Sequence, residues 1–528
     1  MKHEIELGLL IDAIEMRIEF LKEKEEEFGD IIASLHENHQ DCGRNLIHYL
    51  ALRSMKLRSL QAYLANLGLS SMSYSDGYTL ANMTNILSML HHKNGTVDQF
   101  EYDPDDFKIN YFTSKDMLIS NKRRLFGRSD RKKSRAHIMV TMPTEAAENT
   151  ELLKKLLISG MNVARINCSH DNPEIWKKII DNIKTLETEL GHPCKIYMDL
   201  AGPKLRTGPI EEIEGKNKNK KKAHITVIKG DILEIYREQI LGTQPVINGE
   251  GHMEQPGKIS ITLESVFDDV KVGEHIWFDD GKIGGRILDV TPDVMKVEIT
   301  HSHIAGSKLR SEKGVNFPET ALSTASLTAY DIETLPFMAE HADMIGYSFV
   351  RKPEDVKQLQ DELKKLGREN KGIILKIETK EAFNNLPDLL LQAMKGPMAG
   401  VMIARGDLAV EIGFNRIAEV QEQILWICEA AHIPIIWATQ VLDRLAKKGL
   451  ATRAEVTDAA MSGRAECVML NKGPYIEHAV KMLDNILQRM YSHQLKKKGS
   501  LRRLNVAKRF FRKEKEEKTS EQEQPTAE

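Results

Sequence analysis

The sequence predicts a (β/α)₈ barrel with an inserted β-rich domain and a helical N-terminal extension. Eight short apolar runs alternate with longer amphipathic segments, which is typical of parallel strands joined by helices. A long strand-like stretch interrupts this alternation after the third run, and only helical periodicity precedes the first run. A doubly wound open sheet is the alternative, but such a sheet usually ends at about six strands.

The composition is typical of a soluble globular protein. The chain has 528 residues, 41% hydrophobic and 29% charged, which is enough for more than one domain. Its net charge of -3 gives no basic field, so we expect no nucleic-acid partner. Acidic residues interrupt the apolar positions near the N-terminus, so we expect no signal peptide and no membrane anchor. Five cysteines without zinc-site spacing indicate a reducing cytoplasm.

Residues 1–125 are predicted to form the helical extension. The segments "NLIHYLALRSMKLRSLQAYLANLGLSSM" and "YTLANMTNILSMLHHK" repeat apolar residues at spacings of three and four. We expect these helices to cover a face of the barrel or to form a subunit contact in a homo-oligomer. At the other end, residues 493–528 are basic and then polar, which predicts a disordered tail. A basic segment that binds an anionic surface is the alternative.

The barrel is predicted to comprise residues 135–207 and 322–492. The stretch between them, residues 208–321, contains glycine turns and strand-like runs and is too long for a crossover loop, so we expect an inserted domain. The eight predicted barrel strands are "AHIMVTM" at 136, "MNVARIN" at 161, "CKIYMDL" at 194, "ADMIGYSF" at 342, "GIILKIE" at 372, "GVMIARG" at 400, "IPIIWAT" at 433 and "AECVMLN" at 465.

Polar residues follow most of these runs, and in a barrel the ends of the strands meet at the face that carries active sites. Lys376 and Glu378 lie two residues apart, so a strand turns both side chains to one face. A strand that runs out into solvent is the alternative interpretation of this pair. The other polar residues at strand ends are Arg165, Asn167, Ser169, His170, Asp199, Lys204, Arg206, Ser348, Arg351, Arg405, Asp407 and Thr439.

This set of cations around two or three carboxylates predicts a site for a phosphorylated, multiply anionic substrate. Glu378 and Asp407, on adjacent strands, are the expected ligands of Mg²⁺, with Mn²⁺ as the alternative ion. In "ARGDL", Gly406 lets the backbone approach a ligand closely. The amides of Gly406 and Asp407 are therefore expected to bind a substrate carboxylate.

The motifs of the barrel resemble those of pyruvate kinase, over residues 135 to 490 and including the inserted domain. The resemblance implies phosphoryl transfer from phosphoenolpyruvate to ADP, followed by protonation of the enolate to pyruvate, in glycolysis. The motifs that carry it, in order, are "MNVARINCSH", "MDLAGPKLRTG", "SEKGVNFPET", "SFVRKPEDV", "LKIETKEAFNN", "MIARGDLAVEIG", "WATQVLDRL" and "TRAEVTDAA".

The resemblance implies a role for each matching residue near the reacting groups. Lys376 matches the catalytic lysine, which faces the transferred phosphoryl group and the developing enolate. Arg165 matches the arginine that contacts the phosphoryl group, and Thr439 supplies the hydroxyl near the protonated face. Glu378 and Asp407 match the magnesium ligands.

The same resemblance implies how the substrates are held. Gly406 and Asp407 match the backbone that binds the substrate carboxylate. Arg206 and His170 fall where nucleotide phosphates are contacted. Lys313, just before "GVNF", matches a lysine that the inserted domain brings down when it closes, and this closure excludes water.

One departure from the family pattern concerns potassium. Many members hold this ion through positions that match Asn167, Ser169 and Asp199. Here Leu200 follows the aspartate, and Lys204 stands where these members have a glutamate. Exchange of a carboxylate for an ammonium changes the local charge by two units, so we expect a tethered cation to replace the bound one. The sequence therefore predicts activity without potassium.

Three further departures affect the ends of the barrel. The first strand continues as "VTMPTEAA", and the last ends in the short loop "MLNKGPYIEHAV", where Lys472 is a candidate phosphate contact. Both loops lie where nucleotide binding is expected, so they leave the preferred nucleotide open. The chain leaves the barrel near residue 490, so we expect no C-terminal regulatory domain of the usual kind.

Two alternatives to a kinase remain open from the sequence. A non-catalytic regulatory protein that binds phosphoenolpyruvate agrees with the altered first and eighth loops, although the catalytic residues are present. A lyase barrel that stabilises an enolate with magnesium is the other alternative. The inserted domain with its lysine argues against a lyase, which has little use for a phosphate-binding lid.

Overall fold

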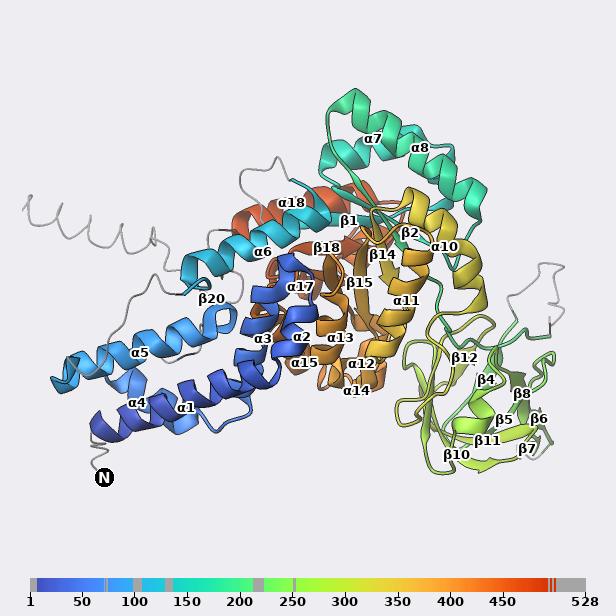
Figure 1. Ribbon diagram of the computed structural model, residues 1–528. Coiled ribbons are helices and arrows are strands. Elements are labelled where there is room, and N and C mark those ends of the chain that lie inside the picture. Colours follow the sequence, from blue (N-terminus) through green and yellow to red (C-terminus); the bar gives the residue numbers. More distant parts are fainter. Residues whose placement is uncertain are drawn as a thin grey trace, which may run out of the picture.

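The computed structural model shows a barrel with a helical region on one side and a β-rich domain on the other (Figure 1). It describes residues 7–70, 72, 75–97, 107–128, 136–211, 223–249, 253–491, 494–495 and 498–499.

The eight predicted strands form a closed parallel barrel, so the fold class is confirmed and the open-sheet alternative is wrong. Their order around the barrel is β1-β18-β17-β16-β15-β14-β3-β2. Near-continuous burial along each strand is typical of parallel strands covered by helices. The bounds are β1 (His137–Thr141), β2 (Val163–Asn167), β3 (Lys195–Asp199), β14 (Met344–Tyr347), β15 (Gly372–Ile377), β16 (Ala399–Ala404), β17 (Ile435–Ala438) and β18 (Cys467–Leu470).

Helices connect the barrel strands and cover their outer faces. Local signals define their ends: the side chains of Asn149 and Asn172 accept backbone N–H bonds at two N-termini, and Gly160 adopts φ of 116° where α7 ends. The helices are α7 (Thr150–Ser159), α8 (Pro173–Leu190), α10 (Ala329–His341), α11 (Pro353–Lys365), α12 (Lys380–Asn384), α13 (Leu386–Ala393), α14 (Arg405–Ile412), α15 (Ile417–Ala430), α16 (Asp443–Lys448), α17 (Arg453–Ser462) and α18 (Ile476–Met490).

The insertion after β3 contains a sheet in the order β13-β9-β10-β11-β5-β8, with a hydrophobic core separate from that of the barrel. Leu233, Ile276 and Val297 belong to this core and are fully buried. Its elements are β4 (Ile225–Val227), β5 (Ile232–Tyr236), β6 (Val246–Ile247), β7 (Met253–Gln255), β8 (Gly257–Ser260), α9 (Val266–Asp269), β9 (His275–Phe278), β10 (Ile283–Val290), β11 (Val294–His301), β12 (Ser307–Leu309) and β13 (Val315–Asn316).

The N-terminal region is helical, as predicted, and part of it has its own apolar core. Ile14 of α1, Leu52 of α3 and Leu87 of α5 pack together in this core. None of the helices in the described residues is both long and apolar enough to span a bilayer. The helices are α1 (Leu7–Glu27), α2 (Gly29–Ser34), α3 (Gln40–Arg53), α4 (Arg58–Asn66), α5 (Thr79–Asn94) and α6 (Tyr111–Phe126).

The end of α6 closes the barrel at the amino-terminal ends of its strands. Leu125 and Phe126 belong to the apolar cluster that fills the barrel interior. A Cβ added to Gly372 or Gly400, near the starts of β15 and β16, would come within 2.6 or 2.8 Å of the Leu125 side chain. The floor of the barrel therefore comes from the N-terminal region, while its opposite mouth is left for a site.

The segment after residue 492 differs in part from the prediction of disorder. A short antiparallel pair, β19 (Gln494–Leu495) and β20 (Lys498–Gly499), lies there. The remainder of the predicted tail lies outside the described residues. The domain boundaries given above stay predictions.

A buried asparagine joins the N-terminal helices to the barrel. The Asn45 side-chain amide donates to the carbonyls of Asp76 and Ala430, both at 2.8 Å, and its oxygen accepts from the Thr79 amide at 2.8 Å. Asn45 is 1% exposed, so water cannot replace these bonds. One side chain thus links α3, the segment before α5 and the end of α15.

We expect Asn45→Ala to lower the free energy of unfolding by about 2–3 kcal/mol, because the three backbone groups lose their partner in a dry site. Thermal or urea unfolding of the full chain measures this change. The matched control is Asn66→Ala, at the exposed end of α4, which should leave the unfolding midpoint unchanged. Equal effects of the two substitutions would contradict the assigned role of Asn45.

Candidate functional site

Lys376 and Glu378 both lie inside the barrel mouth, so the solvent-exposed interpretation is wrong. Lys376 is 7% exposed and Glu378 is 4% exposed. The Lys376 ammonium donates to Ser348 Oγ at 2.6 Å and lies 3.3 Å from Glu378 Oε1 and 3.5 Å from Asp199 Oδ1. Carboxylates on two sides hold this cation at the strand ends.

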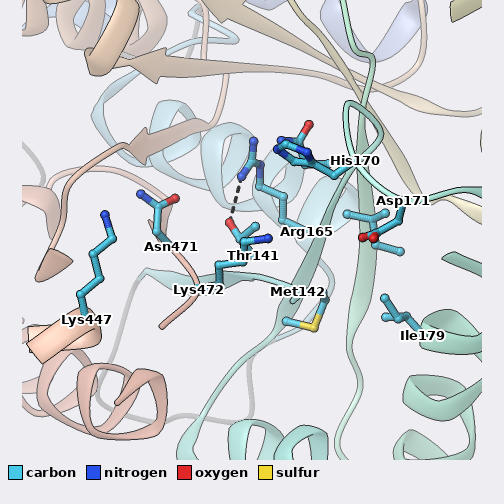
Figure 2. Close-up of a pocket in the computed structure, with 11 residues that line it drawn as sticks. Thr141, Met142, Arg165, His170, Asp171, Ile179, Lys447, Asn471 and Lys472 are labelled. Carbon is cyan, nitrogen blue, oxygen red and sulfur yellow. Dashed lines mark hydrogen bonds between the residues drawn. The ribbon is translucent and has the colours of Figure 1, made fainter. Parts of the chain in front are cut away.

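Arg165 and Asp199 form the adjacent ion pair, between β2 and β3. Arg165 Nε and Nη2 each lie 2.6 Å from Asp199 Oδ2. Arg165 Nη1 donates to Thr141 Oγ1 at 2.9 Å (Figure 2). Asp199 is fully buried, and burial opposes its ionisation. The nearby charges of Arg165 and Lys376 outweigh burial and hold the pKa of the Asp199 carboxyl below its ordinary value.

Glu378 and Asp407 lie on the β15 and β16 side of the same mouth. Glu378 Oε2 accepts the Phe349 amide at 2.6 Å. Burial, together with the negative charge of Asp407, raises the pKa of the Glu378 carboxyl above its ordinary value. Two carboxylates that disfavour each other's charge suit a hard divalent cation, so the donor set fits magnesium.

A divalent ion at this pair needs further oxygen ligands. Within the part of the chain that the structure describes, no group of three or more His, Cys, Asp or Glu side chains is arranged to hold a metal. Water and substrate oxygens would complete the ligand set, as is usual for magnesium.

The structure places Lys204 differently from the sequence-based expectation. Its ammonium donates to both oxygens of Asp407, at 3.0 Å each, rather than lying beside Asp199. The chain turns sharply after β3, where Gly202 adopts φ of 66° and Asp331 accepts the amides of Ala201 and Gly202. This turn carries the lysine to the β16 side of the mouth.

Thr439 and Gly406 face each other across two loops. A Cβ on Gly406 would lie 3.0 Å from Thr439 Cγ2, so glycine permits this approach. Thr439 has φ of 70° and Gln440 has φ of 59°. This left-handed conformation is strained for both residues and is most costly for the β-branched Thr439.

Arg405 holds this strained backbone. Its Nε donates to the Ala438 carbonyl at 2.8 Å and its Nη2 to the Thr439 carbonyl at 2.5 Å. Asp458 of α17 binds the same guanidinium through both oxygens, at 2.5 and 2.8 Å. The sequence marked Arg405 only as a strand-end cation, and Asp458 lies in the motif "TRAEVTDAA" without an assigned role.

A pocket of about 250 Å³ opens beside Arg165 (Figure 2). His170 lies on one side of it, and Asn471 and Lys472, the first residues after β18, lie across from it. Burial and the positive charges of Lys472 and Arg206 lower the pKa of the His170 imidazole. The remaining lining residues are Thr141, Met142, Ile166, Asn167, Asp171, Ile179 and Lys447. Asn471 directly follows the eighth barrel strand, so the search for polar residues at strand ends would also have identified it.

The other predicted residues are Arg206, on the connection into the inserted domain, and Lys313, within that domain. Arg206 Nη1 donates to the Glu312 carbonyl at 3.2 Å, and the Lys313 ammonium binds Asp279 at 2.8 Å. Both bonds lie within the insertion and its connecting strands, so the structure does not bring Lys313 onto the barrel carboxylates. Ser169, also predicted, lies in a turn where its amide donates to Asn167 Oδ1 at 3.2 Å.

Comparisons with known proteins point to one family. The family model described as the pyruvate kinase barrel domain matches residues 133–480. Pyruvate kinases of Staphylococcus haemolyticus (strain JCSC1435) and Staphylococcus aureus (strain USA300) are each 33% identical over 348 residues, 65% of this chain and 54% of the relative. The chain thus spans about half the length of these curated relatives.

A titratable carboxyl joins the inserted domain to the helix that carries Asp407. Asn316 of β13 donates to Glu411 Oε1 at 3.1 Å, and burial raises the pKa of Glu411 from 4.5 to about 7. The negative charge of Asp407 raises this pKa further, and Lys380 opposes the rise. Because the folded chain binds this proton more tightly than the unfolded chain, the free energy of unfolding falls as pH rises from 4.5 to about 7.

We expect Glu411→Gln to stabilise the chain by about 1–2 kcal/mol at about pH 8, and this gain to shrink below about pH 5. Glutamine keeps the oxygen that accepts from Asn316 but has no charge to bury. Unfolding curves across this range, in a chelator that removes divalent ions, measure the effect. The exposed Glu369→Gln is the control. A gain that is independent of pH would contradict a buried ionisation.

Proposed function

Because this chain belongs to the pyruvate kinase family, we propose that it transfers the phosphoryl group of phosphoenolpyruvate to ADP, in glycolysis. The P–O bond of phosphoenolpyruvate breaks, a terminal phosphate oxygen of ADP takes the phosphoryl group, and the enolate that remains takes a proton to become pyruvate. ATP is the second product.

The observation that carries this proposal is the buried Lys376 ammonium, held at the barrel mouth between Ser348 and the carboxylates. Negative charge develops on the phosphoryl oxygens and on the enolate oxygen during transfer. A cation fixed before the substrate arrives stabilises that charge without reorganisation, and in a dry site this effect is large. Arg165, held by Asp199, supplies a second fixed cation for the phosphoryl group.

Magnesium, or manganese in its place, is the proposed cofactor. When bound at Glu378 and Asp407, such an ion polarises phosphoryl oxygens and offsets their charge. Lys204 now binds Asp407, so the protein itself neutralises this carboxylate in the absence of the ion. The amides of Gly406 and Asp407, at the start of α14, are proposed to bind the substrate carboxylate.

The reacting carbon and the nucleotide are assigned to opposite sides of the mouth. The Thr439 hydroxyl lies on the Gly406 side and is proposed to act near the face that is protonated. Arg206 and Lys472 supply positive charge near the pocket beside Arg165, and the His170 imidazole lines it, which supports binding of nucleotide phosphates there. Closure of the inserted domain is proposed to bring Lys313 closer and to exclude water, which otherwise competes with ADP.

Two further proposals concern the setting of the protein. The five cysteines are buried free thiols, which supports a reducing compartment such as the cytoplasm. We also propose a homo-oligomer in which the N-terminal helices form a subunit contact. Analytical ultracentrifugation of the full chain tests it.

We expect Lys376→Met to lower kcat for pyruvate formation from phosphoenolpyruvate and ADP by at least about 100-fold. The assay follows pyruvate in the presence of Mg²⁺. The matched control is Lys371→Met, immediately before β15, because that ammonium binds the Ala342 carbonyl at the far end of the barrel. A wild-type chain that binds phosphoenolpyruvate but forms no pyruvate with any nucleoside diphosphate would instead be a regulatory protein.

We also expect activity without potassium. The protein's own groups engage both oxygens of Asp199: Arg165 binds one, and Lys376 faces the other. These residues therefore do not fit a bound monovalent ion at this carboxylate, although Lys204 lies elsewhere than the sequence suggested. Initial rates in tetramethylammonium and in potassium buffers should agree closely. A strong requirement for potassium would contradict this proposal.

A further inference from the structure

Tyr197 brings a hydroxyl group from the apolar barrel interior to the catalytic layer. It is fully buried on β3, in a cluster whose other members are apolar, such as Met139, Met344 and Met402. Its hydroxyl donates to Asp199 Oδ1. Because the ring is packed on all sides, the hydroxyl has a fixed position below the site.

Gly346 of the neighbouring strand β14 makes room for this contact. A Cβ at Gly346 would collide with the Tyr197 hydroxyl and with Asp199 Oδ1. Any larger residue at this position would therefore displace either the phenol or the carboxylate. The backbone of β14 is arranged around the Tyr197–Asp199 bond.

The two oxygens of Asp199 have different partners. Oδ2 receives Arg165 Nε and Nη2 at 2.6 Å each. Oδ1 receives the Tyr197 hydroxyl, while the Lys376 ammonium stays 3.5 Å away, beyond direct hydrogen-bond range. Lys376 makes its short bond to Ser348 instead, at 2.6 Å.

We propose that Tyr197 is a positioning residue that keeps the Lys376 ammonium available to substrate by occupying the Asp199 oxygen that faces it. This inference rests on the proposed phosphoryl transfer. A buried carboxylate oxygen without a hydrogen-bond donor attracts a nearby ammonium strongly, since the two charges are poorly screened there. An ammonium has three donors, and a direct bond to Asp199 would commit one of them away from the reacting oxygens.

The experiment compares Tyr197→Phe with Tyr347→Phe. Tyr347 lies on β14 and is also fully buried, and its hydroxyl has no hydrogen-bond partner among the described residues. The two substitutions remove the same atom from the same kind of environment. They differ in whether that atom binds Asp199, so Tyr347→Phe controls for the loss of a buried hydroxyl.

We expect Tyr197→Phe to lower kcat about 10- to 100-fold, because a misplaced catalytic cation weakens transition-state stabilisation. KM for phosphoenolpyruvate should change little, and Tyr347→Phe should change neither constant. Ser348→Ala removes the other anchor of Lys376, so its effect on kcat should not add to that of Tyr197→Phe. A purely structural role for Tyr197 would make the effects of Tyr197→Phe and Ser348→Ala on kcat additive.

Crystal structures of the wild type and of Tyr197→Phe supply a readout that does not depend on turnover. The separation between Lys376 Nζ and Asp199 Oδ1, now 3.5 Å, should contract to hydrogen-bond distance in the variant. An unchanged separation would overturn the inference even if the enzyme is active. If the wild type forms no pyruvate but the separation contracts, the proposed function fails and the positioning role stands.

Discussion

The buried carboxylate of Asp199 is the constraint on which the candidate site at the barrel mouth depends. An ionised group that is fully buried costs several kcal/mol unless charges and hydrogen bonds compensate for its lost hydration. Arg165 from β2, Tyr197 from β3 and Lys376 from β15 supply that compensation. The requirement to satisfy one carboxylate therefore fixes the two cations proposed to act on the substrate, and they are in place before any ligand binds.

The inserted domain is tied to the other half of the mouth through α14. Lys204, on the connection into the insertion, binds Asp407, and Asn316, on the return, binds Glu411 one turn further along that helix. Gly281 of the insertion also lies against Phe414, just beyond the same helix. A movement of the inserted domain would therefore act directly on the helix whose first residues include a proposed metal ligand.

The N-terminal region supports the site from the opposite end. Leu125 and Phe126 fill the floor of the barrel and continue the apolar cluster that surrounds the Tyr197 ring. Asn45 and Asn121 bind backbone carbonyls near the end of α15, so polar as well as apolar contacts hold these helices to the barrel. Tyr197 connects the two ends of the barrel, because its ring packs in the apolar cluster above the floor and its hydroxyl binds Asp199 at the mouth.

The sequence by itself determined the barrel, the insertion and most of the strand-end residues. Strand burial and helix caps are local signals, and the barrel rule places the ends of all parallel strands at one face. The sequence could not place Lys204, because the turn at Gly202 depends on Asp331, which lies more than a hundred residues away. Nor could it single out Tyr197, Asp458 or Gly346. Their roles arise from contacts between neighbouring strands and loops, and only the tertiary structure decides which side chains share a buried charge.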